Sequence, residues 1–153
     1  AKGKSTGGFE TKLDDKEKVN WAEATDSNGK LDVYYTDITQ NEVGEVTGWK
    51  QFDKDSVFRE SGVAKYEGHR FLEGTTKDSV GKVKSSNVSK HNEKGEQIEF
   101  SNTTVTKDST TTKVTKYTYE AHDDMGNWTQ RTTWDDKGKA TAIAKRTYTY
   151  KKK

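Results

Sequence analysis

The chain has 153 residues and a formal net charge of +2, and it contains neither cysteine nor proline. The lack of cysteine excludes disulfide bonds, thiolate metal sites and thiol nucleophiles. Leu, Ile, Val and Phe together supply only 22 residues, but 22 Thr, 7 Tyr and 4 Trp favour pleated, half-buried strands. We therefore expect a folded all-β protein rather than a disordered chain.

The chain begins with a Gly-, Ser- and Lys-rich stretch, so residues 1–12 are predicted to be a flexible leader. Such a leader suits a processed mature protein and equally a trimmed one. We expect a single domain over residues 13–150 and a basic tail over residues 151–153. Residues 14–24 hold good helix formers, so a short helix is an alternative there. No apolar run reaches the length of a membrane span.

Turn signals recur along the rest of the chain, most of them 12 to 15 residues apart. The commonest form is Asp/Asn-x-x-Gly, in which the first side chain caps the turn and glycine takes a left-handed conformation. The signals lie at residues 26–29, 41–44, 53–55, 67–68, 78–81, 92–95, 108–109, 123–126 and 135–138.

Side chains between the turns alternate in character, as in Leu31, Val33 and Tyr35. This period of two indicates β-strands. We predict an antiparallel meander of about nine or ten strands, joined by Asp/Asn-x-x-Gly turns in a twisted or curled sheet. A closed up-and-down β-barrel is the alternative fold.

The turn at residues 135–138 also predicts a register for the last hairpin. In that register Trp134 faces Ala140, Thr132 faces Ala142 and Trp128 faces Arg146. Trp128 and Trp134 would then share a face and form an aromatic platform, with Arg146 stacked on Trp128. The alternative is that both tryptophans pack against a second layer as ordinary core residues.

The unit aromatic-Asp-x-x-Gly-Asn/Lys occurs at residues 134–139 and, with an insertion, at residues 119–127, and Tyr148 and Tyr150 start what looks like another copy. Over residues 115–150 the chain resembles the tyrosine-aspartate (YD) repeats of Rhs-type proteins, and it is similar to envelope and secreted proteins of Bacteroidetes-like bacteria. The resemblance implies curling antiparallel sheets that act as scaffolds or shells, with a binding or structural role and no catalytic residues in the repeats.

The sequence offers little support for chemistry. His69, His91 and His122 are far apart in sequence and show no metal-ligand spacing. The turns at residues 26–29 and 53–55 echo the start of calcium loops but lack the full ligand series. Acidic pairs such as Asp135 and Asp136 are explained by turn formation. We expect neither catalysis, nor a metal, nor a cofactor.

Three functions remain open. The first is a non-enzymatic domain of the bacterial cell envelope, or a secreted one, that binds a protein or glycan partner through an aromatic face. The second is a lipocalin-like carrier of small apolar ligands, which requires a closed barrel. The third is a structural subunit of a surface assembly. Nucleic acid is not an expected partner, because Lys far outnumbers Arg. The predicted ligand-binding residues are Trp128, Trp134, Arg146, Tyr148 and Tyr150.

Overall fold

The computed structural model describes residues 7–151, and these residues contain eleven β-strands and no helix. The strands are β1 (Gly8–Leu13), β2 (Val19–Thr25), β3 (Leu31–Gln40), β4 (Val46–Asp53), β5 (Phe58–Glu67), β6 (Arg70–Asp78), β7 (Val83–His91), β8 (Gln97–Val105), β9 (Thr110–His122), β10 (Trp128–Trp134) and β11 (Ala140–Lys145). No helix in the described part is long and apolar enough to cross a membrane.

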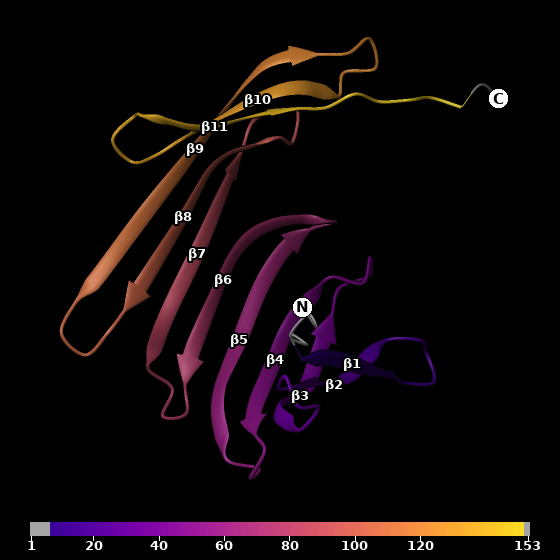
Figure 1. The fold of residues 1–153 in the computed structure, drawn as a ribbon, viewed down its shortest axis with the longest axis vertical. Coiled ribbons are helices and arrows are strands. Elements are labelled where there is room, and N and C mark those ends of the chain that lie inside the picture. Colours follow the sequence, from indigo (N-terminus) through magenta and orange to yellow (C-terminus); the bar gives the residue numbers. More distant parts are fainter. Residues whose placement is uncertain (1–6, 152–153) are drawn as a thin grey trace, which may run out of the picture.

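All eleven strands form one antiparallel sheet in which each strand pairs with its neighbours in sequence. The sheet is open, since β1 and β11 lie at its two ends and do not pair with each other (Figure 1). The predicted all-β meander with a twisted or curled sheet is therefore confirmed, and the closed barrel is wrong. The apolar-ligand carrier thus lacks the closed lumen that it requires.

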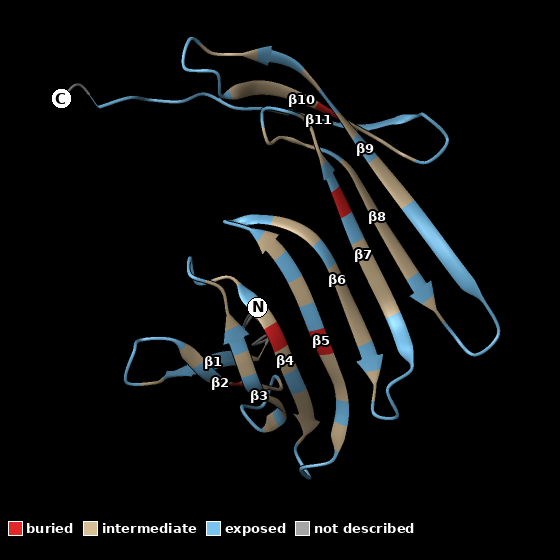
Figure 2. Ribbon diagram, turned by 180° about the vertical axis from the view of Figure 1, so that it is seen from behind, coloured by how far each residue is buried: buried red, intermediate tan, exposed pale blue. Residues whose placement is uncertain are grey.

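The sheet is a single layer. Within the described residues, strands contact only their neighbours in sequence, and nothing covers either face. Between residues 7 and 151, Ala22 is the one buried apolar side chain, and Ser89 and Thr132 are the buried polar ones. Figure 2 accordingly shows intermediate and exposed positions along nearly every strand. Order in this sheet depends on backbone ladders and cross-strand side-chain pairs rather than on a core.

Eight of the ten connections are built alike, as the turn after β2 illustrates. The N–H of Gly29 donates to the carbonyl of Asp26, and the Asp26 carboxylate accepts the N–H groups of Asn28 and Lys30. Gly29 has a φ of 74°, the left-handed conformation that glycine adopts without strain. The same bonds recur in the turns that start at Asp14, Asn41, Asp53, Asp78, Asn92, Asp123 and Asp135.

The N-terminal end departs from the prediction. Residues 8–12, assigned to the leader, lie in β1, which pairs with β2 from Gly8↔Thr25 onward; residues 1–6 of that leader lie outside the described part. The alternative of a short helix at residues 14–24 is wrong, because this segment is a turn followed by β2. Glu17 takes the left-handed position of that turn with a φ of 60°. Because no glycine marks it, the turn was missed, and eleven strands replace the nine or ten expected.

Strand register divides the side chains between two faces, because neighbouring residues of a strand point to opposite sides. Pairing and ring contacts connect the members of each face from strand to strand. Face 1 carries Tyr35, Trp49, Phe71, Phe100 and Tyr119, and face 2 carries Tyr34, Phe52, Val63, Val114 and Trp134.

The middle of the sheet is lined with hydroxyl groups on both sides, because each of β6 to β9 contributes two adjacent Ser or Thr residues. These small side chains form hydrogen bonds across strands, as between Thr103 and Thr112 at 2.9 Å. Because exposed hydroxyl groups can bond to solvent, these side chains need no covering layer. The row on face 1 is Thr76, Ser85, Thr104 and Thr111, and the row on face 2 is Thr75, Ser86, Thr103 and Thr112.

Candidate binding surface

Face 1 carries an apolar hollow over β1 to β4, with a volume of about 360 Å³. The side chains that line it are aliphatic or aromatic except for one threonine, and several are only partly covered. Phe9 at its edge is 65% exposed. An exposed set of apolar groups in one depression marks a place for an apolar partner group. The lining residues are Phe9, Thr11, Val19, Ala22, Tyr35, Ile38, Val46 and Trp49.

Trp49 is the largest side chain of this hollow, and its position depends on a glycine. A Cβ atom built on Gly62 would lie 2.4 Å from the Trp49 indole, so the ring rests directly on the backbone of β5. Tyr35 meets Trp49 edge on, with ring centroids 5.7 Å apart. One side of the indole is thus covered by backbone, and Trp49 also lines the hollow.

Further rings continue along face 1 across the centre of the sheet. Phe71 lies 5.5 Å from Tyr66 and 6.4 Å from Phe100, between ring centroids. The Tyr119 hydroxyl donates to the Gln97 carbonyl at 2.8 Å, and burial raises the pKa of Tyr119. Both observations describe rings held against the sheet, so this stretch is a packed aromatic strip.

Trp128 lies at the β9–β10 end of face 1, where two arginines contact its indole. The guanidinium carbon of Arg146 lies 3.7 Å from the ring centroid and that of Arg131 lies 5.1 Å away. Arg131 also lies over Tyr117, at 4.7 Å, and its Nε atom is buried without a hydrogen-bond partner. The predicted stacking of Arg146 on Trp128 is present, but it occupies a ring surface that a sugar would need.

The residues after β11 continue past Trp128 and the turn that precedes it. Tyr148 and Tyr150 stack with centroids 6.3 Å apart, and Arg146 donates to the Tyr148 hydroxyl at 3.5 Å. The Tyr150 hydroxyl donates to the Asp123 carboxylate, which lowers the pKa of Asp123 and raises that of Tyr150. Asn127 donates to the same hydroxyl. Tyr150 is therefore fixed to the turn that precedes Trp128.

Trp134 does not join this group. Its indole N–H donates to the hydroxyl of Thr118, whereas Trp128 contacts Tyr119, the next residue of β9. Adjacent strand residues point to opposite faces, so the two tryptophans lie on opposite faces, and the predicted shared platform is wrong. Of the five predicted site residues, the structure brings together Trp128, Arg146, Tyr148 and Tyr150.

Bulges explain this difference. The register shifts on both sides of Gln130, and each extra residue reverses the face of the side chains beyond it. A further shift before Trp134 keeps Trp134 opposite Ala140, as predicted, but places Thr132 opposite Ile143 instead of Ala142. Arg146 accordingly pairs with Thr129 instead of Trp128.

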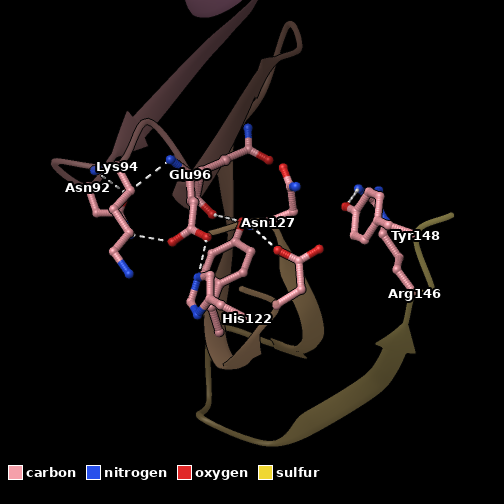
Figure 3. Close-up of polar contacts among 10 residues, drawn as sticks. Asn92, Lys94, Glu96, His122, Asn127, Arg146 and Tyr148 are labelled. Atoms are coloured by element: carbon pink, nitrogen blue, oxygen red, sulfur yellow. Dashed lines mark hydrogen bonds and ion pairs between the residues drawn. The ribbon is translucent and has the colours of Figure 1, made fainter. Parts of the chain in front are cut away.

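Beside this cluster, His122 and Glu96 form a hydrogen bond of 2.7 Å between Nε2 and Oε1, and Asn92 donates to the other oxygen of Glu96 (Figure 3). Burial raises the pKa of Glu96, but the hydrogen bonds from Asn92 and His122 outweigh it, so that the net shift is downward. The pair borders an open hollow of about 570 Å³ between the turn at residues 92–95 and β9.

All three histidines lie at the end of the sheet that carries the turn at residues 92–95. His69 bonds Glu45 at 2.8 Å, and His91 lies 3.4 Å from the Ser89 hydroxyl. Within residues 7–151 no group of His, Asp and Glu is arranged to hold a metal ion. In the two turns that echo calcium loops, the carboxylates of Asp26 and Asp53 accept backbone N–H groups.

No protein-family model matches this chain, and no curated protein matches its sequence significantly.

Sequence reasoning missed the apolar hollow and the second arginine at Trp128. The hollow joins residues of four strands, and its Phe9 was assigned to the leader. Arg131 gave a usable signal, because its alternation with Thr133 places it beside Tyr117 and Tyr119.

Proposed function

We propose that the chain is a non-enzymatic β-repeat domain that binds a protein partner through face 1, at the apolar hollow over β1 to β4. The observation that carries this proposal is an apolar depression of about 360 Å³ on a sheet face that no other layer of the described residues covers. A partner's apolar side chain placed there removes Phe9, Ile38 and Val46 from water, at about 25 cal/mol per Å².

A protein partner is favoured over a glycan because sugars stack on open indole faces. Arg146 lies over Trp128, Lys12 lies 4.2 Å over Trp21, and Gly62 lies against Trp49. An irregular hollow lined by aliphatic and aromatic groups instead suits a protruding apolar side chain. The location in the bacterial envelope, or outside the cell, is part of the proposal and is supported by the resemblance to YD repeats alone.

A photoreactive amino acid at position 46, which lines the hollow, tests the proposal in the native host. The matched control carries it at position 63, an exposed valine on face 2. We expect one protein to be captured from position 46 and not from position 63. The purified partner should then bind the wild type at least tenfold more tightly than Ile38→Asp, by calorimetric titration.

The opposing results are equally specific. Equal capture from both positions, or undiminished binding by Ile38→Asp, would place the partner elsewhere. Titration with a polysaccharide panel, followed by tryptophan fluorescence, covers the glycan alternative. A glycan that binds the wild type but not Trp49→Ala or Trp134→Ala, without any captured protein, would overturn the proposal.

A further inference from the structure

The two ends of the sheet are open edges. Among the described residues, β1 pairs only with β2 and β11 pairs only with β10. Each outer side therefore presents a row of backbone N–H and C=O groups that can pair with another strand. Proteins usually protect such edges with charges, prolines or bulges that disrupt pairing.

The edge of β11 has a bulge at Thr141, near its start, and a charge at Lys145, its last residue, but no such protection between them. Residues 140–144 carry no charge, and Ile143 is 63% exposed. The N–H of Arg146 donates to Thr129 on the β10 side. Because N–H direction alternates along a strand, the N–H groups of Ile143 and Lys145 point to the open side. The edge is thus ready to accept a strand.

The charges at the two ends are complementary. Residues 8–40, which include β1 to β3, hold eight acidic and four basic side chains. Residues 128–151, which include β10 and β11, hold six basic and two acidic ones. Joining β11 to β11 would bring two basic ends together, whereas joining β11 to β1 brings a basic end against an acidic one.

Strand direction and side-chain size select one register for this junction. Because β1 and β11 are both odd-numbered strands of a meander, a second copy in the same orientation places its β1 parallel to β11. Face 1 then continues as face 1, which puts Phe9 on the same side as Ala144. Aligning these two also sets Glu10 beside Lys145 and Gly8 beside Ile143, so that large residues adjoin small ones on both faces.

We propose that copies of this chain associate head to tail, with β11 of one copy pairing in parallel with β1 of the next and Lys145 adjoining Glu10. The same two edges are used at every junction, so association continues beyond a dimer unless curvature closes a ring. This association uses the edges of the sheet and leaves the hollow on face 1 accessible to a partner.

The test is sedimentation velocity of the full chain at low ionic strength, over micromolar to millimolar concentrations. We expect the mean mass to rise with concentration past that of a dimer and to fall in about 1 M salt, where screening acts within about 3 Å. Glu10→Lys and Lys145→Glu should each weaken association about tenfold, because like charges then adjoin.

Mixing the two variants gives the decisive result, because every junction between unlike variants again joins opposite charges. We expect the equimolar mixture to associate as the wild type does. Glu73→Lys makes the same charge change in β6, away from both edges, and should leave association unchanged. Folding of every variant is checked by circular dichroism.

Three outcomes would overturn the proposal. The first is a wild type that stays monomeric at every concentration. The second is association that stops at two copies and is strengthened by mixing Lys145→Glu with the wild type, as β11–β11 pairing requires. The third is a mixture of folded variants that stays as weak as its components.

Discussion

The guanidinium carbon of Arg146 lies 3.7 Å from the ring centroid of Trp128, and this contact fastens the segment after β11 to face 1. The contact is an exposed cation–π interaction, since Arg146 is exposed. Interactions of this kind contribute about 0.5–1 kcal/mol.

Arg146→Ala should therefore lower the free energy of unfolding by about 0.5–1 kcal/mol. A double-mutant cycle with Trp128→Ala, measured by urea unfolding, isolates the pair. Arg59→Ala, near the start of β5, is the control and should be additive with Trp128→Ala. Additive behaviour of Arg146→Ala as well would show that the two residues are not coupled.

Gly62→Ala tests the contact between the Trp49 indole and the backbone of β5. The added Cβ would meet the indole at 2.4 Å, so the ring must move off β5, and overpacking of this kind costs about 1–3 kcal/mol. In a Trp49→Ala background the same substitution should cost nothing or stabilise the strand, because alanine is the better strand residue. Thermal unfolding of the four variants measures this. An equal cost in both backgrounds would rule out the ring contact as its cause.

The aspartates that cap the turns should make the stability of the fold depend on pH, and replacing one of them by asparagine should reduce this dependence. Hydrogen bonds from the N–H groups of Lys30 and Asn28 lower the pKa of Asp26 below its ordinary value of 3.8. A lowered folded-state pKa means that stability is present above about pH 4 and is lost as pH falls through the folded-state pKa. Asp26→Asn keeps the acceptor, as Asn41 and Asn92 do naturally.

The test is to measure the urea concentration at the unfolding midpoint for the wild type and the Asp26 variants between pH 6 and pH 2.5. Asp26→Asn should lose less stability on acidification than the wild type, and Asp26→Ala should be weaker at every pH because two N–H groups lose their acceptor. Identical acid sensitivity of the wild type and Asp26→Asn would contradict the role of this carboxylate.

His91 predicts a second effect, at milder acidity. Burial, together with the nearby Arg70, lowers the pKa of His91 below 6.5, although Glu67 acts in the opposite direction. The folded state then disfavours the protonated ring, so stability is present above about pH 6.5 and falls as pH drops below it. His91→Gln should reduce the fall in melting temperature between pH 7.5 and pH 5.5. His69→Gln is the exposed control, and an equal effect of both would contradict the assignment to His91.

The sheet could be predicted from the sequence because most of its turns carry the local motif Asp/Asn-x-x-Gly. In this motif Gly lies three residues after Asp or Asn. Hydrogen bonds within the turn itself, from side chain and backbone, close it, so no contact with a distant residue is needed. The turn at residues 14–17 has Glu17, and not glycine, in the left-handed position. It forms the same hydrogen bonds as the other turns, but the glycine that identifies them in the sequence is absent. With that turn missed, Gly8–Leu13 could not be recognised as a strand.

The faces were harder to predict than the strands. A single bulge reverses every side chain beyond it, and the shifts around Gln130 arise from pairing between strands, which no local motif reports. Trp128 and Trp134 therefore lie on opposite faces, although the strand that carries them and the turns on either side of it were predicted. The hollow was missed for a similar reason, since Phe9 and Trp49 become neighbours only through three pairs of strands.

An open sheet keeps β1 and β11 at opposite ends, and one distance between these two strands distinguishes it from a closed sheet. Because the chain has no cysteine, spin labels attached at Thr11→Cys and Thr141→Cys report only this pair. The distance between the two labels is measured by electron-spin resonance, with labelled protein diluted in unlabelled protein to suppress contacts between copies. We expect more than about 25 Å, because ten strand spacings of about 4.8 Å separate the labels along the curled sheet. Dipolar broadening from labels within about 10 Å, two strand spacings, would show instead that the two edges meet and that the sheet is closed.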